Sequence, residues 1–129
     1  FEKESIDKNQ LIVREGAYCK KLLFIQEGYL RFYTFTEKKD ITHWIFWKEQ
    51  IVTDVASFYM MEPAKWNIQA LSDCQVYAIS DHHYKQLSET FPLWSRFEKQ
   101  LFVRLLSVLE KRVYSFLSMS AEERYQYLY

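Results

Sequence analysis

Short apolar stretches separated by turn residues fill the N-terminal two thirds of the chain. Their β-branched and aromatic side chains are typical of strands. We expect strands at residues 11–13, 22–25, 29–35, 41–47, 67–71 and 75–79. The two glycines, Gly16 and Gly28, lie in gaps between these stretches, where turns need a positive φ. The pattern predicts a mainly β domain.

The expected strand 41–47 carries bulky rings at both sets of alternating positions. Successive side chains of a strand point to opposite faces. One face should therefore hold His43, Ile45 and Trp47, and the other Thr42, Trp44 and Phe46. Both faces are expected to contact something, and the charged run 37–40 should form the hairpin tip before this strand.

The hydrophobic period changes to that of helices after Ser80. The Ser80 side chain can accept a hydrogen bond from first-turn N–H groups, so we expect it to cap a short helix at 81–88. Pro92 is tolerated in the first turn of a helix and should open a long helix that reaches residue 118. Ser120 and Glu123 have capping-box spacing, which indicates the start of another helix.

Three segments follow from this pattern. We expect a sensing domain with short flanking helices at 1–91, a long helix at 92–118, and the start of a linker or helix toward a further domain at 119–129.

The long helix has an apolar band wider than packing on one sheet requires. Part of the band repeats at the four–three spacing of a coiled-coil seam with one polar position, Arg112. The expected dimer interface is Phe102, Leu105, Leu109, Arg112, Val113 and Phe116. Burial of the whole band inside one subunit is the alternative. We favour the homodimer because a β domain can cover only one side of so long a helix.

Charge and cysteine content narrow the classes of function. Seventeen basic residues balance seventeen acidic ones, which argues against nucleic-acid binding by this part of the protein alone. Cys19 and Cys74 are too few for an iron–sulfur cluster and are expected to be buried or half-buried thiols in a reducing, cytoplasmic setting. No apolar run reaches the length of a membrane span, so we expect no membrane association.

The run Asp54–Phe58 lies between two strand-like stretches and reads as a turn of helix. The first N–H groups of a helix have no partner within the helix, so such a turn can bind an anion. This makes the run the first candidate for a ligand site.

Enzyme chemistry has little support. A jelly-roll metal enzyme needs several clustered histidines, whereas His43 stands alone in its strand. His82 and His83 are adjacent on a helix and point about 100° apart, so they cannot easily share a metal. No nucleophile motif or glycine-rich phosphate loop occurs. We expect no enzyme activity, no metal and no cofactor.

The order and spacing of several segments resemble the N-terminal effector domain of Crp/Fnr-type transcription regulators, which is a cyclic-nucleotide-binding-like domain. The segments that carry the resemblance are Gly16, residues 22–25, Glu27–Arg31, Asp54–Phe58, residues 70–79, Phe91-Pro92 and the tail 117–125. The resemblance implies a double-stranded β-helix, or jelly roll, and a dimerisation helix. It also implies DNA binding through a winged helix-turn-helix that is not in this chain.

The resemblance also supplies a candidate pocket. Cyclic-nucleotide receptors have a cassette that reads Gly-Glu-Leu-Gly/Ala and then Arg-Ser/Thr-Ala, in which the Glu binds the ribose and the Arg binds the phosphate. Here Asp54 stands at the Glu position and Ala64 at the Arg position. The candidate pocket residues are Asp54, Val55, Ala56, Ser57, Lys65, Trp66, Leu109 and Glu110.

Two departures from cyclic-AMP receptors, one in the cassette and one at the long-helix positions Leu109 and Glu110 that face the base in that family, argue against cyclic AMP as the ligand. Ala64 cannot make the bidentate phosphate contact of an arginine, and Lys65 offers only a point charge. Glu110 would bring a negative charge near an anionic ligand. Trp66 either lines a pocket for an unknown apolar or aromatic effector or fills the space itself, which would leave no effector.

We therefore expect the effector-sensing and dimerisation domain of a Crp/Fnr-type regulator that does not respond to cyclic AMP. The alternative is a cyclic-nucleotide-binding-like regulatory module of a signalling protein without DNA binding, such as a channel or kinase.

Overall fold

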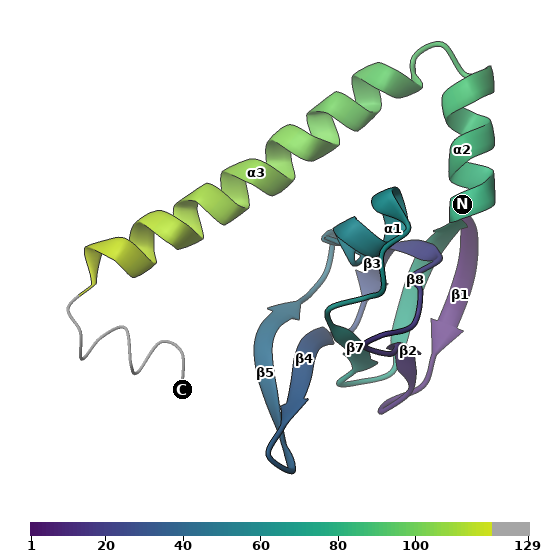
Figure 1. The fold of residues 1–129 in the computed structure, drawn as a ribbon. Coiled ribbons are helices and arrows are strands. Elements are labelled where there is room, and N and C mark those ends of the chain that lie inside the picture. The colour runs from purple at the N-terminus through teal and green to yellow at the C-terminus, as the bar shows by residue number, and fades with distance from the viewer. Residues whose placement is uncertain (120–129) are drawn as a thin grey trace. The chain divides into compact units, whose positions relative to one another are not determined.

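The computed structural model describes residues 1–119 (Figure 1). It separates into two compact units, Phe1–Lys85 and a second unit that begins at Gln86. The strands are β1 (Glu2–Ile6), β2 (Leu11–Val13), β3 (Lys21–Glu27), β4 (Leu30–Thr36), β5 (Lys39–Phe46), β6 (Ile51–Val52), β7 (Asn67–Ala70) and β8 (Cys74–Ser80). The helices are α1 (Val55–Met60), α2 (Asp81–Thr90) and α3 (Trp94–Ser118). No helix within residues 1–119 is long and apolar enough to cross a membrane.

The strands form two four-stranded antiparallel sheets, which confirms the mainly β jelly-roll class. One sheet has the order β1-β8-β3-β6 and the other β2-β7-β4-β5. We call them sheet A and sheet B. Across the described residues they remain two sheets and do not close into a barrel.

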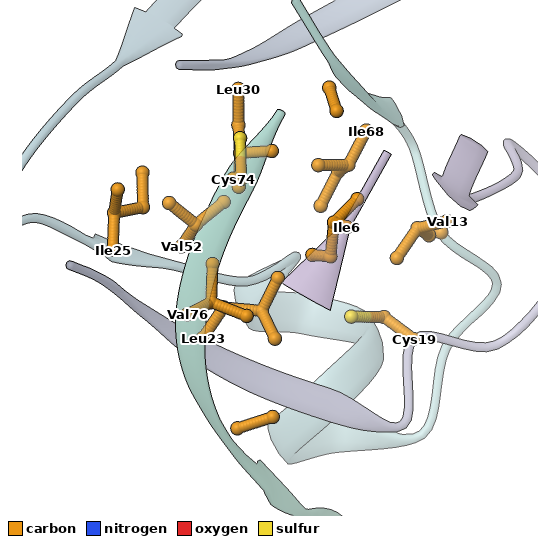
Figure 2. Packing of buried hydrophobic residues seen from close by; sticks show 13 residues of the cluster. Ile6, Val13, Cys19, Leu23, Ile25, Leu30, Val52, Ile68, Cys74 and Val76 are labelled. Carbon is orange, nitrogen blue, oxygen red and sulfur yellow. The ribbon is translucent and has the colours of Figure 1, made fainter. Parts of the chain in front are cut away.

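Apolar side chains from the two sheets point toward one another and form the core (Figure 2). Sheet A supplies Ile6, Leu23, Ile25, Val52 and Val76, and sheet B supplies Val13, Leu30, Ile68 and Ala70. Leu30, Ile25 and Val76 are fully buried. Both cysteines are free thiols buried in this core, as predicted.

The glycine turns also follow the prediction. Gly16 and Gly28 have φ values of 88° and 102°. Gly28 is tightly packed: a Cβ built there would lie 2.6 Å from both the Asp73 carbonyl oxygen and Cys74 Sγ.

Strand β1 was not predicted, because Glu2–Ile6 has only one aliphatic residue. Its five residues pair with Cys74–Ala78 of β8, and the last of them, Ile6, is buried in the core. Tertiary pairing overrides the weak local preference of this polar segment.

The β4–β5 hairpin differs from the sequence prediction in two ways. Its turn is shorter than the charged run 37–40, because Glu37 and Lys38 alone take positive φ and β5 already begins at Lys39. The register then shifts by one residue between Phe32 and Tyr33, so Phe32 pairs with Trp44 while Tyr33 pairs with Thr42. His43 is the extra residue of this β-bulge.

The bulge breaks the predicted alternation of side chains along β5. Thr42 lies on the outer face, where its hydroxyl accepts a hydrogen bond from Arg31 at 2.8 Å. Trp44 and Phe46 pair with inward-facing residues of β4, namely Phe32 and Leu30. The prediction that Thr42 shares a face with Trp44 and Phe46 is therefore wrong.

Helix α2 begins directly after its predicted capping residue, whereas α3 has no side-chain cap. The Ser80 hydroxyl accepts from the His83 N–H at 3.1 Å, as predicted for the cap of α2, and α2 runs two residues beyond the predicted end. The long helix α3 begins two residues after Pro92 and ends at Ser118, as predicted. The capping box at Ser120 and Glu123 and most of the segment 119–129 lie outside the described residues.

Candidate functional site

Helix α1 lies where the sequence placed it, and Asp54 is its N-cap. One carboxylate oxygen, Oδ1, accepts from the Ser57 N–H at 3.2 Å. The other, Oδ2, accepts from the N–H groups of Lys65 at 2.8 Å and Trp66 at 3.4 Å. Asp54 is only 3% exposed. The Asp54 carboxylate therefore occupies the backbone donors both at the start of α1 and at Lys65 and Trp66.

The Ser57 hydroxyl is also used within the protein. Its oxygen accepts from the buried Cys19 N–H at 2.7 Å. The Thr53 hydroxyl donates to the Lys21 carbonyl oxygen at 2.9 Å and lies 3.4 Å from Cys19 Sγ. These contacts connect the start of α1 to the chain before β3 and hold Asp54 in position.

The second half of the cassette has no side chain for a phosphate. Ala64 is 3% exposed, and its backbone is hydrogen-bonded to the turn at Gly16 and Ala17 at 2.8 and 2.7 Å. The Lys65 side chain is exposed, while its N–H is bound to Asp54. Among the remaining candidates on α1, Val55 is 49% exposed and Ala56 is half-buried.

Trp66 belongs to a chain of rings on the inner face of sheet B. It stacks on Phe32 with the ring centroids 5.7 Å apart and meets the His43 ring edge-on at 5.1 Å. Phe46 lies 4.6 Å from Phe32, and Trp44 stacks on Phe46 at 5.8 Å. We call these five rings, Trp66, Phe32, His43, Phe46 and Trp44, the ring cluster.

The β-bulge at His43 helps to assemble this cluster. It brings the imidazole beside Thr34, with Nε2 and Oγ1 2.7 Å apart, although strict alternation would put His43 on the other face. The inward position of Phe32 could have been read from its alternation with Leu30. No signal in the sequence marks the bulge, so His43 was missed as a neighbour of Trp66.

Arg31 of β4 is held by several side chains of sheet B, on the outer face of that sheet. Its guanidinium donates to Gln69 at 2.7 and 3.0 Å and to Asp40 at 3.0 Å, and lies over the Tyr33 ring at 4.0 Å. The hydrogen bond from Arg31 and its charge lower the pKa of Asp40. Arg31 alternates with the buried Leu30, so it cannot replace the arginine that the cassette lacks.

The two other candidates, Leu109 and Glu110, lie on α3 in the second unit and are exposed in the single chain. Their part in a pocket stays a prediction. The structure thus brings together Asp54, Ser57, Lys65 and Trp66. Within residues 1–119, no three His, Cys, Asp or Glu side chains gather as metal ligands.

Comparison with known proteins agrees with the fold. The family model described as "Cyclic nucleotide-binding domain" matches residues 3–91. The chain belongs to the cyclic nucleotide-binding domain family. No curated protein sequence is significantly similar to it.

Solved structures with this fold come from several kinds of protein. The c-di-GMP responsive regulator CLP of Xanthomonas campestris aligns with 92% of this chain and 60% of its own at 14% identity and a TM-score of 0.72. The Thermus thermophilus catabolite activator protein aligns with 90% of this chain and 55% of its own at 18% identity and a TM-score of 0.68. The PKA regulatory domain of Toxoplasma gondii, solved with cAMP, aligns with 66% of this chain and 32% of its own at 15% identity and a TM-score of 0.60.

These likenesses establish the fold, and the chain spans a little over half the length of the two regulators. At the positions compared above with the cassette of cyclic-nucleotide receptors, the Asp54 carboxylate takes the backbone donors of Ser57, Lys65 and Trp66, and position 64 is an alanine.

Proposed function

We propose that this chain is the effector-sensing and dimerisation part of a Crp/Fnr-type transcription regulator that does not respond to cyclic AMP. The hydrogen bonding of the Asp54 carboxylate is the observation that supports the lack of a response to cyclic AMP. The carboxylate accepts three backbone N–H groups around the start of α1, while Ala64 leaves no guanidinium for a phosphate.

An incoming cyclic phosphate would have to compete with a buried carboxylate for the same donors. It would also approach a negative charge that is only 3% exposed and not screened by water. The ring cluster lies on the inner face of sheet B and includes Trp66, whose N–H is one of these donors, and its rings already contact one another. Both features oppose a nucleotide.

Helix α3 supports the dimerisation half of the proposal. Its 25 residues expose many large apolar side chains in the single chain. These are Phe97, Val103, Leu106, Val108, Leu109, Val113, Tyr114 and Leu117. So much exposed apolar surface on one helix is typical of a protein–protein contact. Phe102, Leu105, Arg112 and Phe116 of the predicted seam are half-buried in the single chain.

Calorimetric titration with cyclic AMP and cyclic GMP tests the ligand half. We expect no binding at millimolar nucleotide, both for the unaltered protein and for Trp66→Ala, because removal of a ring restores neither the arginine nor the free donors. Micromolar binding by the unaltered protein would overturn the proposal. Binding by Trp66→Ala alone would show that the ring, and not the missing donors, excludes the nucleotide.

Sedimentation equilibrium tests the dimerisation half. Arg112→Leu at the polar seam position should tighten the dimer, because a charged group no longer has to be desolvated or turned to solvent. Arg104→Leu, an exposed position outside the predicted seam, is the matched control. An unchanged dissociation constant for Arg112→Leu would refute the seam.

The alternative, a regulatory module in a signalling protein without DNA binding, uses the same fold, as the PKA regulatory domain illustrates. The coding sequence beyond Tyr129 distinguishes the two. A helix-turn-helix there supports the regulator, whereas a kinase or channel domain supports the alternative.

A further inference from the structure

A cavity of about 640 Å³ opens on the first unit at the Gly28 turn. It is lined by Lys3, Gln26, Glu27, Gly28, Tyr29, Trp47, Lys48 and Gln75. None of these residues belongs to α1, to the ring cluster or to the predicted pocket. Its volume is in the range of sites for small molecules, roughly 300–1,000 Å³.

One wall of the cavity is the turn between β3 and β4, and its backbone is fixed. Gly28 has a left-handed φ of 102° and is packed against Asp73 and Cys74. The Tyr29 N–H donates to the Ser72 hydroxyl at 3.1 Å, and the Tyr29 carbonyl oxygen accepts from the Leu71 N–H at 2.9 Å. The Tyr29 ring is therefore presented from a rigid main chain.

The other wall is the turn from Trp47 to Gln50. The Trp47 N–H donates to the Gln50 side-chain oxygen at 3.2 Å, and the Gln50 N–H donates to the Trp47 carbonyl oxygen at 3.2 Å. Glu49 and Gln50 pair with the backbone of Ile25 at 2.8 and 3.0 Å, which anchors this turn to the core strand β3. Both walls are thus held in place without a ligand.

Four of the side chains that line the cavity, Lys3, Tyr29, Trp47 and Lys48, are exposed. Tyr29 and Trp47 are 53% and 52% exposed, so the faces of two rings are accessible at one cavity. Within residues 1–119 neither Lys3 nor Lys48 forms an ion pair. Glu27 is the single acidic residue of the lining, so the cavity has one net positive charge.

From these groups we infer a binding site for a small planar aromatic carboxylate. The ring of the ligand stacks against Trp47 and Tyr29, and its carboxylate faces Lys3 and Lys48. The Gln26 side-chain amide and the Gln75 NH₂ group offer hydrogen bonds at the rim, while the Gln75 Oε1 already accepts from the Ser5 hydroxyl at 3.0 Å. The inference does not depend on the proposed regulatory function.

The test is a titration of the ¹⁵N-labelled chain with indole-3-acetate, with indole-3-acetamide and tryptamine as neutral and cationic counterparts. We expect saturable shifts of the Gly28 and Lys48 amides and of the Trp47 indole N–H, strongest for the acid. No shift at millimolar acid, equal shifts for all three compounds, or shifts confined to the Trp44 and Trp66 indoles would overturn the inference.

Variants separate the two kinds of contact. Trp47→Ala should weaken binding of the acid about tenfold, the scale of one lost aromatic contact, while Phe35→Ala, an exposed ring outside the cavity, should not. The double change Lys3→Gln and Lys48→Gln should abolish the preference for the acid over the amide, whereas Lys38→Gln should preserve it. Glu27→Gln should strengthen binding several-fold, because it removes the opposing charge. Weaker binding by Glu27→Gln would contradict the charge argument.

Discussion

The α1 region and the Gly28 turn use their polar groups in opposite ways. At α1 the donors of Ser57, Lys65 and Trp66 converge on the buried Asp54 carboxylate, and the rings of sheet B pack on one another. At the Gly28 turn the backbone is equally well fixed, but the rings and the lysines face solvent. Membership of a ligand-binding family therefore does not by itself locate a ligand site: the backbone donors at the candidate cassette are taken by Asp54, and an accessible group of rings and lysines lies elsewhere.

The largest expected effect tests how rigid the Gly28 turn is. Gly28→Ala should lower the free energy of unfolding by about 3 kcal/mol or more, because a left-handed φ and a severe clash act together. Gly16→Ala has a similar φ of 88° but open space around the added Cβ, so it should cost only about 1 kcal/mol. Urea denaturation measures both. Equal losses would show that the packing against Asp73 and Cys74 contributes nothing.

The next effect tests the internal anion at α1. In Asp54→Asn one carboxylate oxygen becomes an NH₂ group, so at least one buried N–H loses its acceptor. We expect a loss of about 1–3 kcal/mol in the free energy of unfolding. Asp73→Asn is the matched control, since the Asp73 carboxylate accepts the Lys8 N–H at 2.8 Å in an exposed setting and should lose less. A smaller loss for Asp54→Asn than for Asp73→Asn would mean that the α1 donors do not depend on the carboxylate.

The sequence predicted those parts of the fold that have a local cause. The turn at Asp54, the Ser80 cap and both glycine turns each depend on a residue with a strong capping or backbone preference. Helix α3 has no side-chain cap and begins two residues later than predicted. Strand β1 and the bulge at His43 depend on pairing with distant strands, and their own residues give no such signal. The positions of most helices and strands were therefore predicted correctly, whereas the face on which Thr42 and His43 of β5 lie was not.

The sequence predicted the turn of helix at Asp54 but not the hydrogen bonds of the Asp54 carboxylate. Alignment with the family cassette put Asp54 at a ribose-binding position, whereas the structure shows the same carboxylate capping α1 and holding the chain at Lys65. Which donors an aspartate meets depends on the path of the chain between Met61 and Trp66. That path is set by packing and by the hydrogen bonds of Ala64 to the Gly16 turn, which no local pattern encodes.

The smallest expected effect concerns the thiol beneath the Gly28 turn. Cys74 is buried, and its Sγ donates to the carbonyl oxygens of Ser72 at 3.2 Å and Tyr29 at 3.4 Å. Burial raises the pKa of the Cys74 thiol above its ordinary value. Between the ordinary and the raised pKa, the unfolded chain has lost this proton while the folded chain retains it. The contribution of the Cys74 thiol to the free energy of unfolding is therefore fully present below about pH 8.5, the ordinary pKa of a thiol. This contribution is lost as the pH rises through the raised pKa of the folded protein.

Chemical denaturation across the alkaline range measures this effect. The free energy of unfolding should fall less steeply with pH in Cys74→Ala than in the unaltered protein. Cys19→Ala is the matched control, because Cys19 is not among the groups that shift the pKa of Cys74. In Cys19→Ala the single remaining thiol should react with a disulfide reagent much more slowly in the folded protein than in urea. Rapid reaction in the folded state would mean that the Gly28 turn opens readily. The Gly28 turn would then differ from the α1 region in its mobility, and not only in the exposure of its rings and lysines.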